Sequence, residues 1–161
     1  MGSKTTAKIT DGGWVLATLL DGDPRGMALY KRHYSYRKYA DGREPKLFVG
    51  PGEKMVMLSF QSNALFVWRK FKDDSGQVGV NCAVFRNESP IKSSDLIQEA
   101  MSLAWQRWPG QRLYTYVKQK KVKSVNPGYC FKKAGWKLCG ITKSGKLILE
   151  TFPLCASKEA V

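Results

Sequence analysis

One amphipathic helix, set between strand-like segments, constrains the fold of this chain most strongly. Its apolar residues recur at the three- and four-residue spacing of a helix and are Leu96, Ile97, Ala100, Leu103, Ala104 and Trp108. Ser93 or Ser94 is the expected N-cap, Asp95 adds negative charge to the first turn, and the Pro-Gly pair at 109–110 ends the helix. We therefore expect this helix to cover a sheet built from the segments around it.

The segments on both sides of the helix carry strand and turn signals. Strand-like runs precede it at 54–60, 63–71 and 77–86, and the polar turn at 73–76 makes the last two a hairpin. A strand at 112–117, a Lys-rich loop, a short helix near 127–134 and a closing hairpin of 136–142 and 146–152 follow it. Residues 14–20 are expected to form one strand or helix, and residues 30–46 a helix end followed by a loop.

From residue 63 onward the expected order is β-β-α-β-α-β-β. This order predicts the α+β class, with a central, mostly antiparallel sheet flanked by helices. The length of 161 residues predicts a single domain over 1–161, with residues 1–12 flexible.

The chain carries a large excess of positive charge. It has 27 Lys or Arg and 13 Asp or Glu, which gives a formal net charge of +14. Such an excess causes self-repulsion in a compact molecule, and a polyanionic partner relieves it. Apolar residues make up 43% of the chain, enough to bury a core, so a disordered polybasic segment is not expected. We expect a folded protein that binds nucleic acid or another polyanion, and among these partners double-stranded DNA is the one we expect.

Cysteine and histidine usage argues against the common zinc sites. Cys82, Cys130, Cys139 and Cys155 show no CxxC spacing, and His33 is the only histidine. The thiols are expected to be small buried hydrophobes in a reducing cytoplasm. No segment approaches the ~20 apolar residues of a membrane span, and the N-terminus lacks the apolar stretch of a signal peptide.

The segment Phe-Lys-Lys-Ala-Gly-Trp at 131–136 forms the end of the expected short helix and leads into the closing hairpin. It resembles the Tyr-x-Lys-x-Gly-Phe end of the last helix in GNAT acyltransferases, which lies beside the thiol end of acyl-CoA. The resemblance implies a GNAT-like fold in which strands 77–86 and 112–117 are neighbours that splay apart at their C-terminal ends. The chain departs from that family in two places. Residues 86–94 lack the glycines of the pyrophosphate loop, and Phe131 replaces the tyrosine that often protonates the leaving thiolate, a role for which Tyr129 is the substitute.

His-Tyr-Ser at 33–35 resembles an element of the phage Mom proteins, GNAT-like enzymes that hypermodify adenine in phage DNA and shield it from restriction. Further matching pieces follow in order over roughly residues 28–152: Arg86, Ser93 or Ser94, Thr-Tyr-Val-Lys at 115–118 and Gly-Tyr-Cys-Phe at 128–131. Lys118 stands where the family has an aspartate. The resemblance implies a phage-encoded protein in the bacterial cytoplasm, with iron as a possible metal held by His33 and Tyr34.

These considerations give two sets of candidate site residues. The catalytic candidates are His33, Tyr34, Ser35 and Tyr129. His33 is expected to act as a general base or ligand, kept neutral at pH 7 by the charges of Arg32, Arg37 and Lys38. The candidates for binding acetyl-CoA or another acyl-CoA are Arg86, Asn87, Lys92, Ser93, Ser94, Asn126 and Phe131. Arg86 is equally well placed for an ion pair with Glu88 or Asp95.

Two basic and aromatic segments, 30–46 and 118–137, are candidates for contacts with nucleic acid. The second contains seven lysines and no acidic residue. The nucleic-acid candidates are Arg32, Arg37, Lys38, Lys118, Lys120, Lys121, Lys123, Lys132 and Lys133. Tyr129 is the candidate for stacking on an extruded base, whereas Trp136 is expected in the core.

Three functions are consistent with these features. The first is a GNAT-like enzyme that modifies DNA bases, as the resemblance to the Mom family implies. The second is an acetyl-CoA-dependent N-acetyltransferase that acts on a protein or a small amine. The third is a non-catalytic GNAT-like module that binds nucleic acid or inhibits a host protein.

Overall fold

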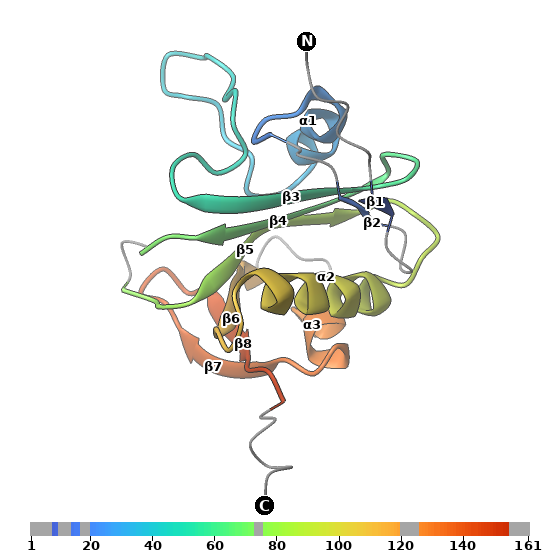
Figure 1. Ribbon diagram of the computed structural model, residues 1–161. Coiled ribbons are helices and arrows are strands. Elements are labelled where there is room, and N and C mark those ends of the chain that lie inside the picture. The colour runs from blue at the N-terminus through green and yellow to red at the C-terminus, as the bar shows by residue number, and fades with distance from the viewer. Residues whose placement is uncertain (1–7, 10–13, 17–19, 73–75, 120–125, 155–161) are drawn as a thin grey trace, which may run out of the picture.

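A computed structural model describes residues 8–9, 14–16, 20–72, 76–119 and 126–154 (Figure 1). In this part of the chain, eight strands form one sheet in the order β1-β2-β3-β4-β5-β6-β8-β7. The strands are β1 (Lys8–Ile9), β2 (Trp14–Leu16), β3 (Glu53–Ser59), β4 (Ala64–Lys70), β5 (Val80–Asn87), β6 (Leu113–Val117), β7 (Lys137–Ile141) and β8 (Leu147–Thr151). The helices are α1 (Pro24–Lys31), α2 (Ser93–Arg107) and α3 (Tyr129–Lys133). The molecule therefore has the expected mixed α+β architecture.

The helices cover opposite faces of the sheet. Helix α1 lies on one face, and α2 and α3 lie on the other, as Figure 1 shows. Strand β4 is covered on both faces: Leu65 and Val67 pack on the side of α1, and Phe66 and Trp68 pack on the side of α2. This double burial explains why β4 reads as a continuous apolar run.

Two tryptophans of the sheet fix the position of α2. Trp14 and Trp68 each donate an indole N–H, at 2.9 Å, to the backbone carbonyls of Leu96 and Ala100 respectively. Trp136, expected in the core, is 3% exposed and donates its indole N–H to Met101 Sδ. Buried indoles thus gain hydrogen-bond partners while packing against the apolar stripe of the helix.

The start of α2 differs from the expectation. The N-cap is Lys92, with extended backbone (φ −59°, ψ 132°) and no side-chain cap, so neither Ser93 nor Ser94 is the N-cap. The Ser93 hydroxyl is within 3.0 Å of Asn87 Nδ2, which donates to it. A serine at the first helical position cannot cap the helix, because the capping side chain must precede the first turn.

The expected strands match the observed ones to within a few residues, and the hairpins are present as expected. Residues 14–20 contribute a strand, Trp14–Leu16, rather than a helix. The expected flexible segment 1–12 contains one short strand, Lys8–Ile9, and its other residues lie outside the described part of the chain. None of the helices in the described residues has the length and apolar character needed to span a membrane.

Strands β5 and β6 are the only parallel neighbours among the described strands, and they separate early. Their Cα partners are Val80↔Leu113, Asn81↔Tyr114 and Cys82↔Thr115, after which both strands continue without pairing to each other. On its other edge β5 has a bulge, since Val67 pairs with Val84 and Trp68 with Cys82, which leaves Ala83 unmatched. A bulge bends and twists its strand, so β5 turns away from β6 at this point. The predicted splay of these two strands is confirmed.

Candidate active site

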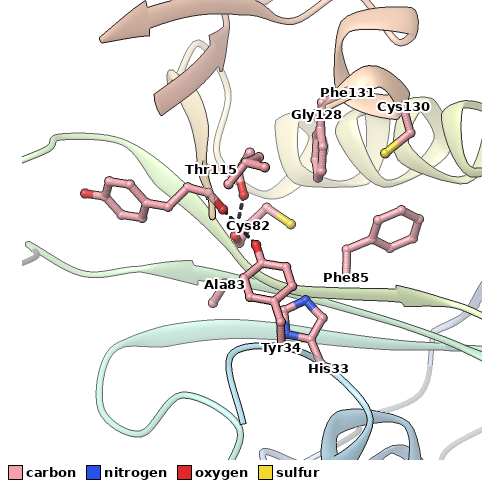
Figure 2. Close-up of a pocket in the computed structure, with 11 residues that line it drawn as sticks. His33, Tyr34, Cys82, Ala83, Phe85, Thr115, Gly128, Cys130 and Phe131 are labelled. Carbon is pink, nitrogen blue, oxygen red and sulfur yellow. Dashed lines mark hydrogen bonds between the residues drawn. The ribbon is translucent and has the colours of Figure 1, made fainter. Parts of the chain in front are cut away.

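The gap between the diverging strands contains an apolar pocket of about 150 Å³ (Figure 2). Strand β5 supplies one wall, β6 the other, and α3 closes one end. The lining residues are His33, Tyr34, Cys82, Ala83, Phe85, Thr115, Tyr116, Val117, Gly128, Cys130 and Phe131. The Thr115 hydroxyl donates to the carbonyl oxygen of Cys82 at 2.9 Å and so closes the point where the strands part.

Tyr34 completes the hydrogen bonding of the β6 edge that the splay leaves open. Its hydroxyl donates to the carbonyl oxygen of Tyr116 at 3.0 Å and accepts a hydrogen bond from the backbone N–H of Lys118. A residue of a paired parallel strand would bridge the same two backbone groups. Burial raises the pKa of Tyr34 to about 12, so the hydroxyl stays protonated at neutral pH.

His33 is held in one orientation and one tautomer. Its Nδ1 accepts a hydrogen bond from the backbone N–H of Ser35 at 3.1 Å and lies 2.6 Å from the Ser35 hydroxyl. Because a backbone N–H only donates, Nδ1 must carry a lone pair, and the proton of the neutral ring therefore sits on Nε2. The ring stacks on Tyr34, with centroids 4.3 Å apart, and Figure 2 shows both rings directed at the pocket.

The pKa of His33 is lowered to about 4, mainly by burial and secondarily by the charge of Arg86. The expected direction is confirmed, but the expected cause is wrong. Arg32, Arg37 and Lys38 are exposed cations screened by water, whereas burial acts directly against the charged imidazolium. The neutral Nε2–H ring is a hydrogen-bond donor, so this geometry does not support the expected role of general base.

An ion-pair cluster anchors the loop that carries His33. Arg32 donates to both carboxylate oxygens of Glu88, at 2.6 and 2.8 Å, and Arg86 donates to the same carboxylate at 3.0 Å. The pKa of Glu88 is lowered to about 2, and the hydrogen bonds from Arg32 are the largest cause of this shift. This cluster joins the end of α1 to the end of β5, and it makes Arg86 an ion-pair partner of Glu88.

The remaining candidates for binding an anionic cofactor lie around the start of α2. Asn87 donates through Nδ2 to the carbonyl of Ile91 and to Ser93 Oγ, and accepts through Oδ1 from Ser89, so it fixes the turn before the helix. Lys92 is exposed beside the amides of Ser93 and Ser94, which precede the first hydrogen bonds within the helix.

The candidates on and near α3 fall into two groups. Phe131 is 7% exposed and lines the pocket. Tyr129 is 55% exposed and is not among the lining residues, and Asn126 accepts a hydrogen bond from Lys132. The structure thus brings Phe131, but not Tyr129 or Asn126, to the gap.

A second, polar chamber of about 210 Å³ adjoins the apolar pocket. Four residues line both, namely Tyr34, Cys82, Ala83 and Tyr116. The polar chamber adds Ser35, Asn81, Lys118 and Lys146. Since Asn81 lies between the α2-facing residues Val80 and Cys82 in strand β5, its side chain is on the face of the sheet that α1 covers. We name these spaces the apolar pocket and the polar chamber.

Those of the expected nucleic-acid residues that the structure describes lie on both sides of the sheet. Lys118 lines the polar chamber, and Arg37 and Lys38 are exposed on the neighbouring loop. Lys132 and Lys133 belong to α3 on the opposite side of the sheet, and Arg32 is paired with Glu88. Lys120, Lys121 and Lys123 lie outside the described residues.

The described cysteines Cys82, Cys130 and Cys139 are free thiols. Burial raises the pKa of Cys82 and Cys130, so both are protonated, and Cys139 is exposed, contrary to the expectation of buried thiols. Cys155 lies outside the described residues. In the described part of the chain no three His, Cys, Asp or Glu side chains are grouped as metal ligands.

The residues at hand do not fit the possible iron site. The Nδ1 lone pair of His33 is engaged by Ser35, and the Tyr34 hydroxyl is a buried, protonated donor to Tyr116. Iron prefers sites that supply several imidazole or carboxylate ligands, and neither side chain offers a free anionic oxygen or a second imidazole.

Asn81, Tyr116, Cys130 and Lys146 line the site but were not among the expected site residues. The sequence signal that these four residues share is their position, because each lies at or near the end of the parallel pairing or where α3 and β8 face it.

A scan against protein-family models, a search of curated proteins and a search of solved structures found no match to the chain.

Proposed function

We propose that this protein is a GNAT-like transferase that modifies a base in DNA and that the gap between β5 and β6 is its reaction centre. The observation that carries the proposal is the splay of two parallel strands at Cys82 and Thr115, with His33 and Tyr34 held in the opening. The resemblance of residues 33–35 and 131–136 to the Mom and GNAT families supports the same interpretation.

The apolar pocket suits the acyl end of an acyl-CoA. Phe85, Val117 and Phe131 offer apolar surface, and the β5 edge beyond Cys82 faces no paired strand on this side within the described residues. Free backbone groups of a strand edge pair readily with the amides of an extended ligand. The Ser93 and Ser94 amides and Lys92 are the residues that would hold its phosphates.

When bound, an acyl-CoA would supply the acyl group: a carbon–nitrogen bond to the base amine forms, the carbon–sulfur bond breaks, and the amine proton leaves with the thiol. The Nε2–H of His33 is suited to donate a hydrogen bond to the oxygen on which negative charge develops. A neutral imidazole pre-oriented by Ser35 does this without a reorganisation cost. Tyr34 separates the two spaces and holds the β6 edge in place.

The charge of the molecule favours DNA over a small amine as the acceptor. The formal net charge is +14, and Lys118 and Lys146 line the polar chamber. Arg37 and Lys38 are exposed on the same loop that supplies Tyr34 and Ser35 to this chamber. Lysine and arginine neutralise phosphates without reading sequence, which leaves the choice of base to the chamber.

Nucleoside mass spectrometry tests this function without assuming a donor. DNA from bacteria that express the protein is digested to nucleosides and compared with DNA from cells carrying an empty vector. We expect one nucleoside of increased mass in the first sample. Unchanged nucleosides together with tight DNA binding by the purified protein would contradict the enzyme and favour the non-catalytic alternative. A separate calorimetric titration with acetyl-CoA tests the donor, and absence of binding there would remove acetyl-CoA alone.

A further inference from the structure

The described lining of the apolar pocket carries no formal charge. Among the eleven described residues that line it, none is Asp, Glu, Lys or Arg. Its imidazole, His33, is neutral at pH 7, mainly because burial lowers the pKa of the ring to about 4. Burial also raises the pKa of the Cys82 and Cys130 thiols, so both stay protonated. A chain with a formal net charge of +14 therefore has a pocket whose described lining is electrically neutral.

The hydroxyl groups of Thr115 and Tyr34 are already hydrogen-bonded within the protein. Thr115 donates to the carbonyl oxygen of Cys82 at 2.9 Å, and Tyr34 donates to that of Tyr116 at 3.0 Å. The Nε2–H of His33 belongs to a neutral ring, so an anion that enters the pocket gains no counterion from it. The described lining thus offers apolar surface and hydroxyls that are already engaged, and it lacks a cation that would compensate a buried negative charge.

The cations close to this site do not line the pocket. Arg86 acts on the pKa of His33 through its charge, but its Nε donates to the Glu88 carboxylate at 3.0 Å. Lys118 and Lys146 line the polar chamber and are not among the residues that line the apolar pocket. Transfer of a carboxylate from water into such surroundings without a counterion is strongly unfavourable. The apolar pocket therefore disfavours an anionic group.

The volume of the pocket limits the length of the group that it can hold. It measures about 150 Å³, and a water molecule takes about 30 Å³ of the liquid, so the space suits roughly five non-hydrogen atoms. A butyryl group has that number of carbon and oxygen atoms. Phe85 and Phe131, whose ring centroids are 6.0 Å apart, border the pocket together with Cys130 (Figure 2). We propose, on the basis of the function proposed above, that this pocket selects the acyl donor: it admits an uncharged acyl group no longer than about butyryl and rejects one that ends in a carboxylate.

Calorimetric titration of the wild-type protein with matched acyl-CoA molecules tests the inference. Butyryl-CoA and succinyl-CoA differ at the end of the acyl chain, where succinyl carries a carboxylate in place of a methyl group. Unacylated CoA is the reference, because the difference in affinity isolates the contribution of the acyl group. Each buried methylene is worth up to about four-fold in affinity, so we expect butyryl-CoA to bind about ten-fold or more tightly than CoA. Succinyl-CoA is expected to bind no more tightly than CoA, and octanoyl-CoA no more tightly than butyryl-CoA.

A matched pair of variants places a cation inside or outside the pocket. Cys130 lines the pocket, whereas Cys139 is exposed on β7 and is not among the lining residues. We expect Cys130→Lys to bind succinyl-CoA about five-fold or more tightly than CoA, because the added ammonium group pairs with the carboxylate. Cys139→Lys is expected to keep the wild-type order of affinities. The melting temperature of each variant shows whether it is folded, and the wild-type titrations decide the inference even if Cys130→Lys does not fold.

The possible outcomes separate this inference from the proposed function. Wild-type protein that binds succinyl-CoA as tightly as butyryl-CoA, or octanoyl-CoA more tightly than butyryl-CoA, would overturn the selection and leave the DNA-modifying function standing. If neither CoA nor any of its acyl forms binds, the acyl-CoA donor and this inference fail together. Nucleoside mass spectrometry still decides in that case whether the protein modifies DNA.

Discussion

At the scale of single residues, the proposed chemistry depends on which ring nitrogen of His33 carries the proton. His33, Tyr34 and Ser35 were identified as a group through the resemblance of residues 33–35 to an element of the Mom proteins, and His33 is the only histidine of the chain. The sequence could not show that the backbone N–H of Ser35 donates to Nδ1, since that contact depends on how the loop after α1 folds back. The proposed role of hydrogen-bond donor, in place of base, depends on this single contact.

Substitutions of His33 distinguish a donor from a base. Glutamine at this position keeps an N–H near the place of Nε2, whereas leucine keeps only bulk. We expect His33→Leu to lower the modification rate by about 10²–10³-fold and His33→Gln to retain a measurable part of it. Rates come from time courses of nucleoside mass spectrometry on DNA treated with a lysate of expressing cells. Equal loss in both variants would favour a general base.

The burial of His33 also predicts how stability depends on pH. The pKa is about 4 in the folded protein and 6.5 in the unfolded chain, so the unfolded state binds more protons between these values. The contribution to stability is therefore complete above pH 6.5 and is lost as the pH falls toward 4. Urea unfolding at pH 7 and pH 5 should show a loss of about 2 kcal/mol from this group, absent in folded His33→Gln. The same pH dependence in both proteins would show that His33 is not buried as described.

At the scale of elements, the order of strands and helices follows from the sequence, whereas the geometry at their ends does not. Alternation and turn residues predicted the two hairpins, and the stripe from Leu96 to Trp108 predicted α2. Asp23 before Pro24 would have located the start of α1, because Asp is a preferred N-cap and Pro a preferred first residue. The predicted N-cap of α2 was wrong because the helix already includes Ser93, so Lys92 precedes the first helical residue. The bulge at Ala83 has no sequence signal, since nothing in a β-branched or apolar run shows which residue will be left unmatched.

The bridging of the β6 edge by Tyr34 predicts a cost for losing one hydroxyl. Tyr34→Phe removes the hydroxyl that bonds the Tyr116 carbonyl and the Lys118 amide. We expect a loss of about 1–3 kcal/mol in the free energy of unfolding, measured by urea denaturation. Tyr39→Phe is the matched control, since Tyr39 is 56% exposed and should change stability by less than about 0.5 kcal/mol. Equal stability of wild type and Tyr34→Phe would mean that the hydroxyl does not bridge the strand edge.

At the scale of the whole molecule, the net charge predicted a polyanionic partner but not which surface of the protein contacts it. The net charge of +14 favours a polyanion, yet the fold divides the expected lysines between the two sides of the sheet. Periodicity cannot show this division, because it depends on where α3 packs relative to β6. The cations near the polar chamber, rather than the whole Lys-rich segment, are the ones we expect to contact DNA.

The salt dependence of duplex DNA binding tests that surface. If Arg37, Lys38, Lys118 and Lys146 each neutralise one phosphate, log K should fall against log salt with a slope of roughly −3 to −4. Lys146→Gln should make the slope shallower by about one, and Lys133→Gln on α3 should leave it unchanged. A larger change for Lys133→Gln than for Lys146→Gln would place the DNA on the other side of the sheet.

The central claim is that the gap between β5 and β6 is the place where the base is modified. The most direct test makes the same change inside and outside it: Cys130 lines the apolar pocket, whereas Cys139 is exposed on β7 and is not among the lining residues. DNA from cells expressing each variant is analysed by nucleoside mass spectrometry, and duplex binding and melting temperature confirm that both proteins are folded. Our account predicts that Cys130→Trp binds DNA but forms no modified nucleoside, while Cys139→Trp forms it at the wild-type level. Undiminished modification by folded Cys130→Trp would contradict the account.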